Sequence, residues 1–137
     1  MDKKLELLAR VPLFSRMDGT ALSHVAKLAD EVDLPAGKEL LHEGAIAYEF
    51  FLILEGSVRI ERDGAPLNRL GPGDFLGEIA LLDGGRRTAT AIADSTVRLL
   101  VLGRREFNSL LNEFPDVRAA VLEALAGRVR EHESVDD

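Results

Sequence analysis

The spacing of apolar residues changes twice along this chain, and this change limits the folds open to it. Near the amino end apolar residues recur at helical spacing, as in Leu22, Val25, Ala26 and Ala29. Further along the period falls to two, because Val58 and Ile60 alternate with charged residues, as in half-buried strands. Helical spacing returns after Gly103, and Pro115 fits the first turn of a last helix. The pattern predicts a strand-rich centre between helices.

Glycines and prolines divide the central part into short segments joined by turns. Asp63-Gly64 is a dipeptide typical of a two-residue hairpin. Many short strands with such turns predict a sandwich or a barrel. At 137 residues the chain has the length of one domain, residues 1–137. We expect leading helices over residues 1–30, strands over 31–102 and closing helices over 103–134.

Composition excludes several classes of protein. Lys and Arg total 17 against 24 Asp and Glu, and this net charge of -7 argues against a nucleic-acid partner. The chain has no cysteine, which excludes disulfides and thiol catalysis. Its longest apolar runs, such as Phe50 to Leu54, fall far short of the ~20 residues of a membrane-spanning helix. We expect a cytoplasmic protein with neither nucleic acid nor membrane as a partner.

The residues with most chemical character lie in one segment, residues 73–91. A glycine that opens a short helix lets the backbone approach a ligand, and the free N–H groups of the first turn attract an anion. Arg87 offers a planar fork for two phosphate oxygens. Glu78 offers an acceptor for a sugar hydroxyl. An acceptor beside an anion site indicates a nucleotide.

This segment resembles the phosphate-binding cassette of cyclic-nucleotide-binding domains, the family of the cAMP receptors and cyclic-nucleotide-regulated kinases. The family's Gly-Glu-(Leu/Ile)-Ala-Leu is matched by Gly77 to Leu81, and its Arg-(Ala/Ser/Thr)-Ala-(Thr/Ser) by Arg87 to Thr90. Further matches begin at Val11-Pro12-Leu13-Phe14 and extend to the last helix. The resemblance implies an α+β, mainly β fold: an antiparallel β-roll (double-stranded β-helix, or jelly roll) flanked by N-terminal helices and a C-terminal helix pair.

The resemblance also implies roles for single residues. Glu78 would accept the ribose 2′-hydroxyl, Arg87 would pair with the cyclic phosphate, and Thr88 would reach the phosphate or the amino group of a syn guanine. Thr88 slightly favours cGMP over cAMP as the ligand, but it does not decide between the two nucleotides. No cofactor is expected besides this ligand. The expected ligand-binding residues are Ile60, Leu70, Gly77, Glu78, Ile79, Ala80, Arg87, Thr88 and Ala89.

Two departures from the family pattern and two expected hinges bear on how the domain would regulate. Arg86 stands where the family usually has proline, so the loop before Arg87 is expected to be mobile until ligand arrives. Gly84-Gly85 and Gly127 are expected hinges, through which ligand would order the loop and reposition the last helix. The chain ends before a helix-turn-helix domain could begin, so we expect a stand-alone regulatory domain. Occupancy would be coupled to a homodimer surface on the C-terminal helix or to a protein partner.

Two other classes remain open. A scaffold or dimerisation module that kept the fold and lost the ligand is favoured by Arg86 and by the missing output domain. A cupin-type metalloenzyme would need closely spaced histidines on strands, whereas His24, His42 and His132 are far apart. Of these only His42 lies in a strand-like segment. We therefore expect no enzyme, no metal site, and surface or capping roles for the histidines.

Overall fold

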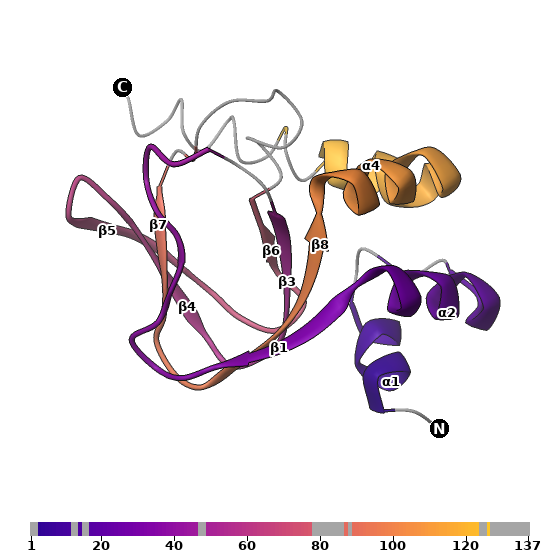
Figure 1. The fold of residues 1–137 in the computed structure, drawn as a ribbon, viewed down its shortest axis with the longest axis horizontal. Coiled ribbons are helices and arrows are strands. Elements are labelled where there is room, and N and C mark those ends of the chain that lie inside the picture. Colours follow the sequence, from indigo (N-terminus) through magenta and orange to yellow (C-terminus); the bar gives the residue numbers. More distant parts are fainter. Residues whose placement is uncertain are drawn as a thin grey trace.

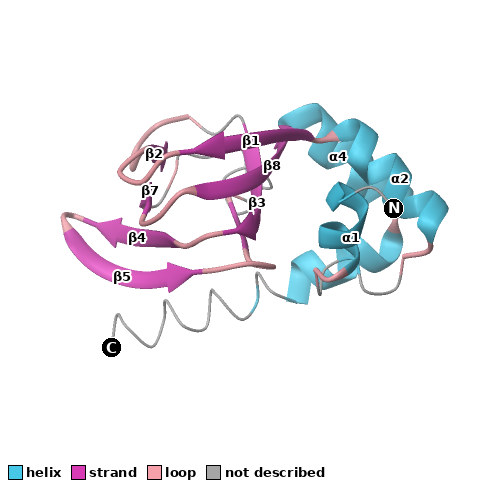
Figure 2. Cartoon of the chain, turned by 90° about the horizontal axis from the view of Figure 1, so that it is seen from below, coloured by secondary structure: helices cyan, strands magenta, loops and turns pink. Residues whose placement is uncertain are grey.

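The helices gather on one side of the molecule and the strands on the other (Figure 2). The computed structural model describes residues 3–11, 14, 17–46, 49–77, 87, 89–123 and 126. Helices α1 (Lys3–Ala9) and α2 (Gly19–Leu28) precede the strands, and α4 (Arg104–Glu113) follows them. A further helix occupies residues 115–123.

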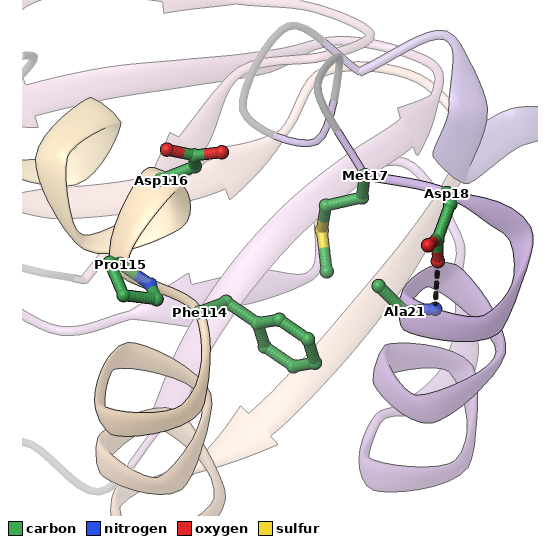
Figure 3. A pocket seen from close by; sticks show the side chains of 6 residues that line it. All are labelled: Met17, Asp18, Ala21, Phe114, Pro115 and Asp116. Atoms are coloured by element: carbon green, nitrogen blue, oxygen red, sulfur yellow. Dashed lines mark hydrogen bonds between the residues drawn. The ribbon is translucent and has the colours of Figure 1, made fainter.

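Helix α2 begins at a side-chain cap (Figure 3) and ends beside helix α1. Asp18 is its N-cap and accepts a hydrogen bond from the Ala21 amide at 2.8 Å. Helix α1 meets the other end of α2, because Lys4 donates to the carbonyls of Ala26 and Ala29 at 2.8 and 3.1 Å. A cation at that end suits the carbonyl-rich end of a helix. The two predicted N-terminal helices are confirmed.

The strands form two antiparallel sheets that face each other and make the roll (Figure 1). The first sheet has the order β1-β8-β3-β6, with strands β1 (Asp30–Leu34), β8 (Val97–Gly103), β3 (Glu49–Glu55) and β6 (Phe75–Leu76). The second has the order β2-β7-β4-β5, with strands β2 (Glu39–Leu41), β7 (Thr90–Ala93), β4 (Val58–Arg62) and β5 (Ala65–Leu70). The predicted α+β, mainly β roll with flanking helices is confirmed.

The hairpin between β4 and β5 turns where the sequence predicts. Asp63 and Gly64 have φ values of 53° and 79°, the left-handed pair that a two-residue hairpin turn requires. Arg62 and Ala65 pair across the turn. The Asp63 amide also donates to the Glu43 carboxylate at 3.0 Å, which ties the hairpin tip to the turn after β2.

Strand β3 separates two hydrophobic cores. Phe50, Leu52 and Leu54 belong to the core between the first sheet and the helices. Phe51 and Ile53 point the other way, into the interior of the roll. Because successive side chains of a strand alternate between its faces, both faces of β3 are covered, and residues 50–54 are all buried.

The C-terminal helices pack on the first sheet through apolar side chains. Helix α4 buries Phe107, Leu110 and Leu111, and the following helix buries Val117 and Val121. Ala124, Leu125 and the expected hinge Gly127 lie outside the described residues. No helix among the described residues has the length and apolar character needed to cross a bilayer.

Phe50 joins β3 to α4 and provides a test of this core. Its ring is fully buried, stacks on Phe107 with centroids 4.6 Å apart, and meets Phe75 at 5.5 Å. Phe50→Ala should lower the free energy of unfolding by about 3–5 kcal/mol, measured by urea denaturation. Leu67→Ala, on the exposed strand β5, should change it by less than about 0.5 kcal/mol. Equal losses in the two variants would contradict this account of the core.

Candidate functional site

Arg87 is the one polar or charged residue that is buried in the part of the chain that the structure describes, with 7% of its surface exposed. Arginine is almost never buried in a folded protein without hydrogen-bonding partners. Perturbed or buried charges also cluster at functional sites. The burial of Arg87 therefore points to a functional site around it.

The backbone of Arg87 is fixed by the turn that follows β2. The Arg87 amide donates to the Ala45 carbonyl at 2.8 Å, and the Gly44 amide donates to the Arg87 carbonyl at 2.9 Å. The Thr90 hydroxyl accepts from the Glu43 amide at 3.1 Å. The start of β7 and the turn after β2 therefore hold the main chain on both sides of the arginine.

The guanidinium of Arg87 brings together two distant parts of the chain. Its Nη1 donates to the Gly77 carbonyl at 2.8 Å, and its Nη2 donates to the Glu49 carbonyl. Gly77 belongs to the predicted cassette, whereas Glu49 is the first residue of β3. Gly77 and Arg87, two of the expected ligand-binding residues, are therefore in contact in the structure.

The close approach of Arg87 explains why a glycine occupies position 77. Gly77 has a φ of +93°, which side chains with a Cβ rarely adopt. A Cβ at this position would lie 2.6 Å from Nη1 of Arg87 and 2.8 Å from the Glu49 carbonyl oxygen. Both distances are shorter than van der Waals contact, so a larger residue would have to displace the guanidinium or the start of β3.

The expected apolar contacts lie on the second sheet. Ile60 and Leu70 are half-buried and pack against the core inside the roll. Ile60 pairs with Ala91 of β7, and Leu70 pairs with Val58 of β4. Ala89 is half-buried and lies between Arg87 and the start of β7. Strand β7, which begins just after Arg87, therefore pairs with β4, the strand that carries Ile60.

Four expected ligand-binding residues, Glu78, Ile79, Ala80 and Thr88, lie outside the described residues. The same holds for Gly84, Gly85 and Arg86 in the expected mobile loop. Their roles remain predictions. Sequence reasoning also missed Ala45 and Glu49, since both act through main-chain carbonyls that have no side-chain signature.

The other arginines with ion pairs meet carboxylates at the surface. Asp94 accepts contacts from Arg59 at 3.3 Å and from Arg69 at 3.1 Å. Arg98 lies 3.0 Å from Asp33 and 3.5 Å from Glu31. The hydrogen bond to Asp33, together with the charge of Asp33, raises the pKa of Arg98 above its ordinary value. These arginines tie strands together on the outside of the molecule.

The described histidines are exposed, as predicted, and each faces a carboxylate. Nε2 of His24 lies 2.7 Å from Glu113, and Nδ1 of His42 lies 2.9 Å from Glu39. His42 was expected in a strand, but β2 ends at Leu41 and His42 begins the turn, so that placement was wrong. His132 lies outside the described residues. Within those residues no three His, Cys, Asp or Glu side chains are grouped as metal ligands would be.

Comparison with known proteins agrees with this geometry. The family model of the cyclic nucleotide-binding domain matches residues 31–114. The potassium/sodium hyperpolarization-activated cyclic nucleotide-gated channel 3 of Mus musculus is 38% identical over 90% of this chain. The CRP-like cAMP-activated global transcriptional regulator of Mycobacterium tuberculosis is 32% identical over 91%. The crystal structure of Thermus thermophilus catabolite activator protein superposes with a TM-score of 0.82 and 31% identity, over 91% of this chain and 62% of that one.

The chain belongs to the cyclic nucleotide-binding domain family, as the resemblance predicted. Domains of this family regulate and do not catalyse. The chain spans 16% of the length of the mouse channel and 58% of the mycobacterial regulator.

Gly77→Ala tests the contact with Arg87, and Gly37→Ala is its matched control. Gly37 has a similar φ of +89° with open space around it, so that variant measures the backbone cost alone, about 1–2 kcal/mol of unfolding free energy. Gly77→Ala should cost about 1–3 kcal/mol more, because its Cβ also meets Arg87 and Glu49. Urea denaturation measures both. Equal costs would show that Arg87 does not require a glycine here.

Proposed function

We propose that this chain binds a cyclic mononucleotide, cAMP or cGMP, and acts as a regulatory module. The observation that carries the proposal is the buried guanidinium of Arg87, held against Gly77 in a chain of this family. A planar, permanently charged guanidinium suits the two free oxygens of a cyclic phosphate. Its two carbonyl contacts hold the fork in one place before a ligand arrives, which lowers the entropy lost on binding.

The remaining roles follow the sequence motif. Arg87 would pair with the cyclic phosphate, and Glu78 would accept from the ribose 2′-hydroxyl. The backbone N–H groups around Ala80 and Ala89 would complete the anion cradle, with Gly77, Ile79 and Thr88 beside them. Ile60 and Leu70, half-buried at the roll interior, would pack on the sugar and base.

The named relatives support both ligand and regulation. The mouse protein is a cyclic nucleotide-gated channel, and the mycobacterial protein is a cAMP-activated transcriptional regulator. In this chain, ligand charge would draw the loop before Arg87 inward and shift the last helix. The output would be a dimer surface on that helix or a contact with another protein in the cytoplasm. Coupling of this kind is typically about 1–3 kcal/mol.

A second candidate is a scaffold or dimerisation domain that keeps the fold without binding a nucleotide. One observation favours it: Arg87 already donates to two main-chain carbonyls and so has a structural use. Under this alternative the arginine only fastens Gly77 to the start of β3.

Isothermal titration calorimetry separates the two candidates. Nucleotide-stripped protein is titrated with cAMP, cGMP and, as a control, AMP. Binding of a cyclic nucleotide but not of AMP supports the sensor and names its signal. Failure of all three to bind at millimolar concentration supports the scaffold.

Arg87→Ala should weaken binding of the cyclic nucleotide by about 2–4 kcal/mol, because it removes the charged partner of the phosphate. Arg98→Ala is the matched control, since Arg98 has carboxylate partners on the first sheet and should leave affinity unchanged. Calorimetry measures both, after a thermal melt shows that each variant is folded. Unchanged affinity in Arg87→Ala would contradict the assigned site.

Thr88→Ala tests the choice of base. Removing one hydrogen-bonding hydroxyl should cost about 0.5–1.5 kcal/mol of cGMP binding and less of cAMP binding. Thr88→Ser keeps a hydroxyl and should keep the preference. Equal losses for the two nucleotides in Thr88→Ala would remove the argument for guanine.

A further inference from the structure

The turn after β2 is fastened to the chain on both sides of the buried arginine. The Glu43 amide donates to the Thr90 hydroxyl at 3.1 Å, at the start of β7. The Gly44 amide donates to the Arg87 carbonyl at 2.9 Å, and the Arg87 amide donates to the Ala45 carbonyl at 2.8 Å. The turn therefore holds the main chain that carries the guanidinium.

Glu43 also reaches the tip of the β4–β5 hairpin, through its side chain. The half-buried Glu43 carboxylate accepts a hydrogen bond from the Asp63 amide at 3.0 Å. Within the hairpin the pair that closes the turn is Arg62 with Ala65, so the Asp63 amide takes its acceptor from outside the hairpin. Glu43 thus makes one contact with β7 through its backbone and one with the hairpin tip through its carboxylate.

The β4–β5 hairpin is weakly held by its own pairing near this tip. Strand β5 is the outermost strand of the second sheet in the described part of the chain, and its residues are exposed except for half-buried Leu70. The register of the hairpin shifts between Ile60 and Glu61, and Pro66, opposite Glu61, has no N–H to donate. The hairpin extends outward from the roll in Figure 1. A carboxylate that holds its tip therefore adds to a weak ladder.

Glu43 lies where the pairing between β4 and β7 ends. The last pair of that ladder is Glu61 with Thr90. Beyond it β4 continues to the hairpin tip at Asp63, and the other chain continues back toward Arg87. The two bonds of Glu43, to Thr90 and from Asp63, extend the connection past the last ladder pair.

We propose that Glu43 is a positioning residue for the nucleotide site, an inference that rests on the proposed function. The proposed site takes the phosphate from Arg87, whereas Ile60, three residues before Asp63, packs on the sugar and base. Glu43 connects the two chain segments that carry these residues, so it sets the separation between the guanidinium and the apolar wall. A site whose two parts are fixed in advance loses less entropy when a ligand binds.

The effect of Glu43 is transmitted through the protein and does not depend on its charge. A carboxylate repels a phosphate, so its negative charge by itself would weaken binding. What it offers the site is an oxygen acceptor at the right place for the Asp63 amide. Glu43→Gln separates these two properties, because glutamine keeps the oxygen acceptor and removes the charge.

Isothermal titration calorimetry with the cyclic nucleotide that the parent protein binds, cAMP or cGMP, tests the proposal. Glu43→Ala removes the acceptor of the Asp63 amide and leaves the main-chain bond to Thr90. Its dissociation constant should rise about three- to tenfold, the worth of one hydrogen bond. Glu43→Gln should stay within about twofold of the parent. A merely structural role would lower the melting temperature of Glu43→Ala and leave the affinity of the folded protein unchanged.

Hydrogen exchange in the ligand-free protein follows the contact itself. The Asp63 amide, observed by nuclear magnetic resonance, should exchange about three- to tenfold faster in Glu43→Ala than in the parent or in Glu43→Gln. Equal exchange in Glu43→Ala and the parent would show that the carboxylate does not hold the hairpin tip, and would overturn the proposal.

Glu39→Ala is the matched control for the calorimetry. Glu39 is an exposed carboxylate on β2, and its side chain contacts His42, so its removal should leave the affinity unchanged. Parent-like affinity in Glu43→Ala, an equal loss in Glu43→Gln, or an equal loss in Glu39→Ala would overturn the positioning role while the proposed function stands. A parent protein that binds no cyclic nucleotide would overturn the proposed function, and this role with it.

Discussion

Burial of β3 on both faces is the constraint on which the other parts of the structure depend. One face carries Phe50 against the helices, and the other carries Phe51 and Ile53 into the roll. The strand is held at its edges by β8 and β6. A strand covered in this way can neither shift its register nor move outward without exposing large apolar side chains. Its first residue, Glu49, therefore offers Arg87 a carbonyl in a fixed position.

The contact between Arg87 and Gly77 gives a physical reason for the glycine in the motif. The sequence motif places a glycine ten residues before an arginine, and its chemistry suggests only that backbone and ligand come close. In the structure the glycine makes room for the arginine itself, since a Cβ would lie 2.6 Å from Nη1. A guanidinium seated this way is oriented by two carbonyls. The glycine is thus a requirement of the arginine's position, whether or not it also approaches a ligand.

Local sequence patterns predicted those features of the fold that depend on neighbouring residues. The helical spacing in α2, the hairpin at Asp63-Gly64 and the start of the last helix at Pro115 all depend on neighbours a few residues apart. These local patterns could not predict how the strands pair, because β1 pairs with β8 across more than sixty residues. At the candidate site the sequence singled out Gly77 and Arg87, which the structure brings into contact, but it missed Ala45 and Glu49, whose main-chain carbonyls accept from Arg87. His42 was placed in a strand-like segment, whereas β2 ends one residue before it, at Leu41.

Neighbouring residues of β3 connect the proposed nucleotide site to the C-terminal helices. The Glu49 carbonyl accepts from Arg87, and the Phe50 ring stacks on Phe107 of α4 at 4.6 Å. A phosphate bound to this guanidinium would slightly adjust its contact with Glu49, which directly precedes Phe50 in β3. Close-packed interiors pass small displacements on rather than absorb them, so α4 responds through the ring stack. The proposed coupling then needs only a small adjustment of the Phe50 ring against Phe107, with β3 kept in its register.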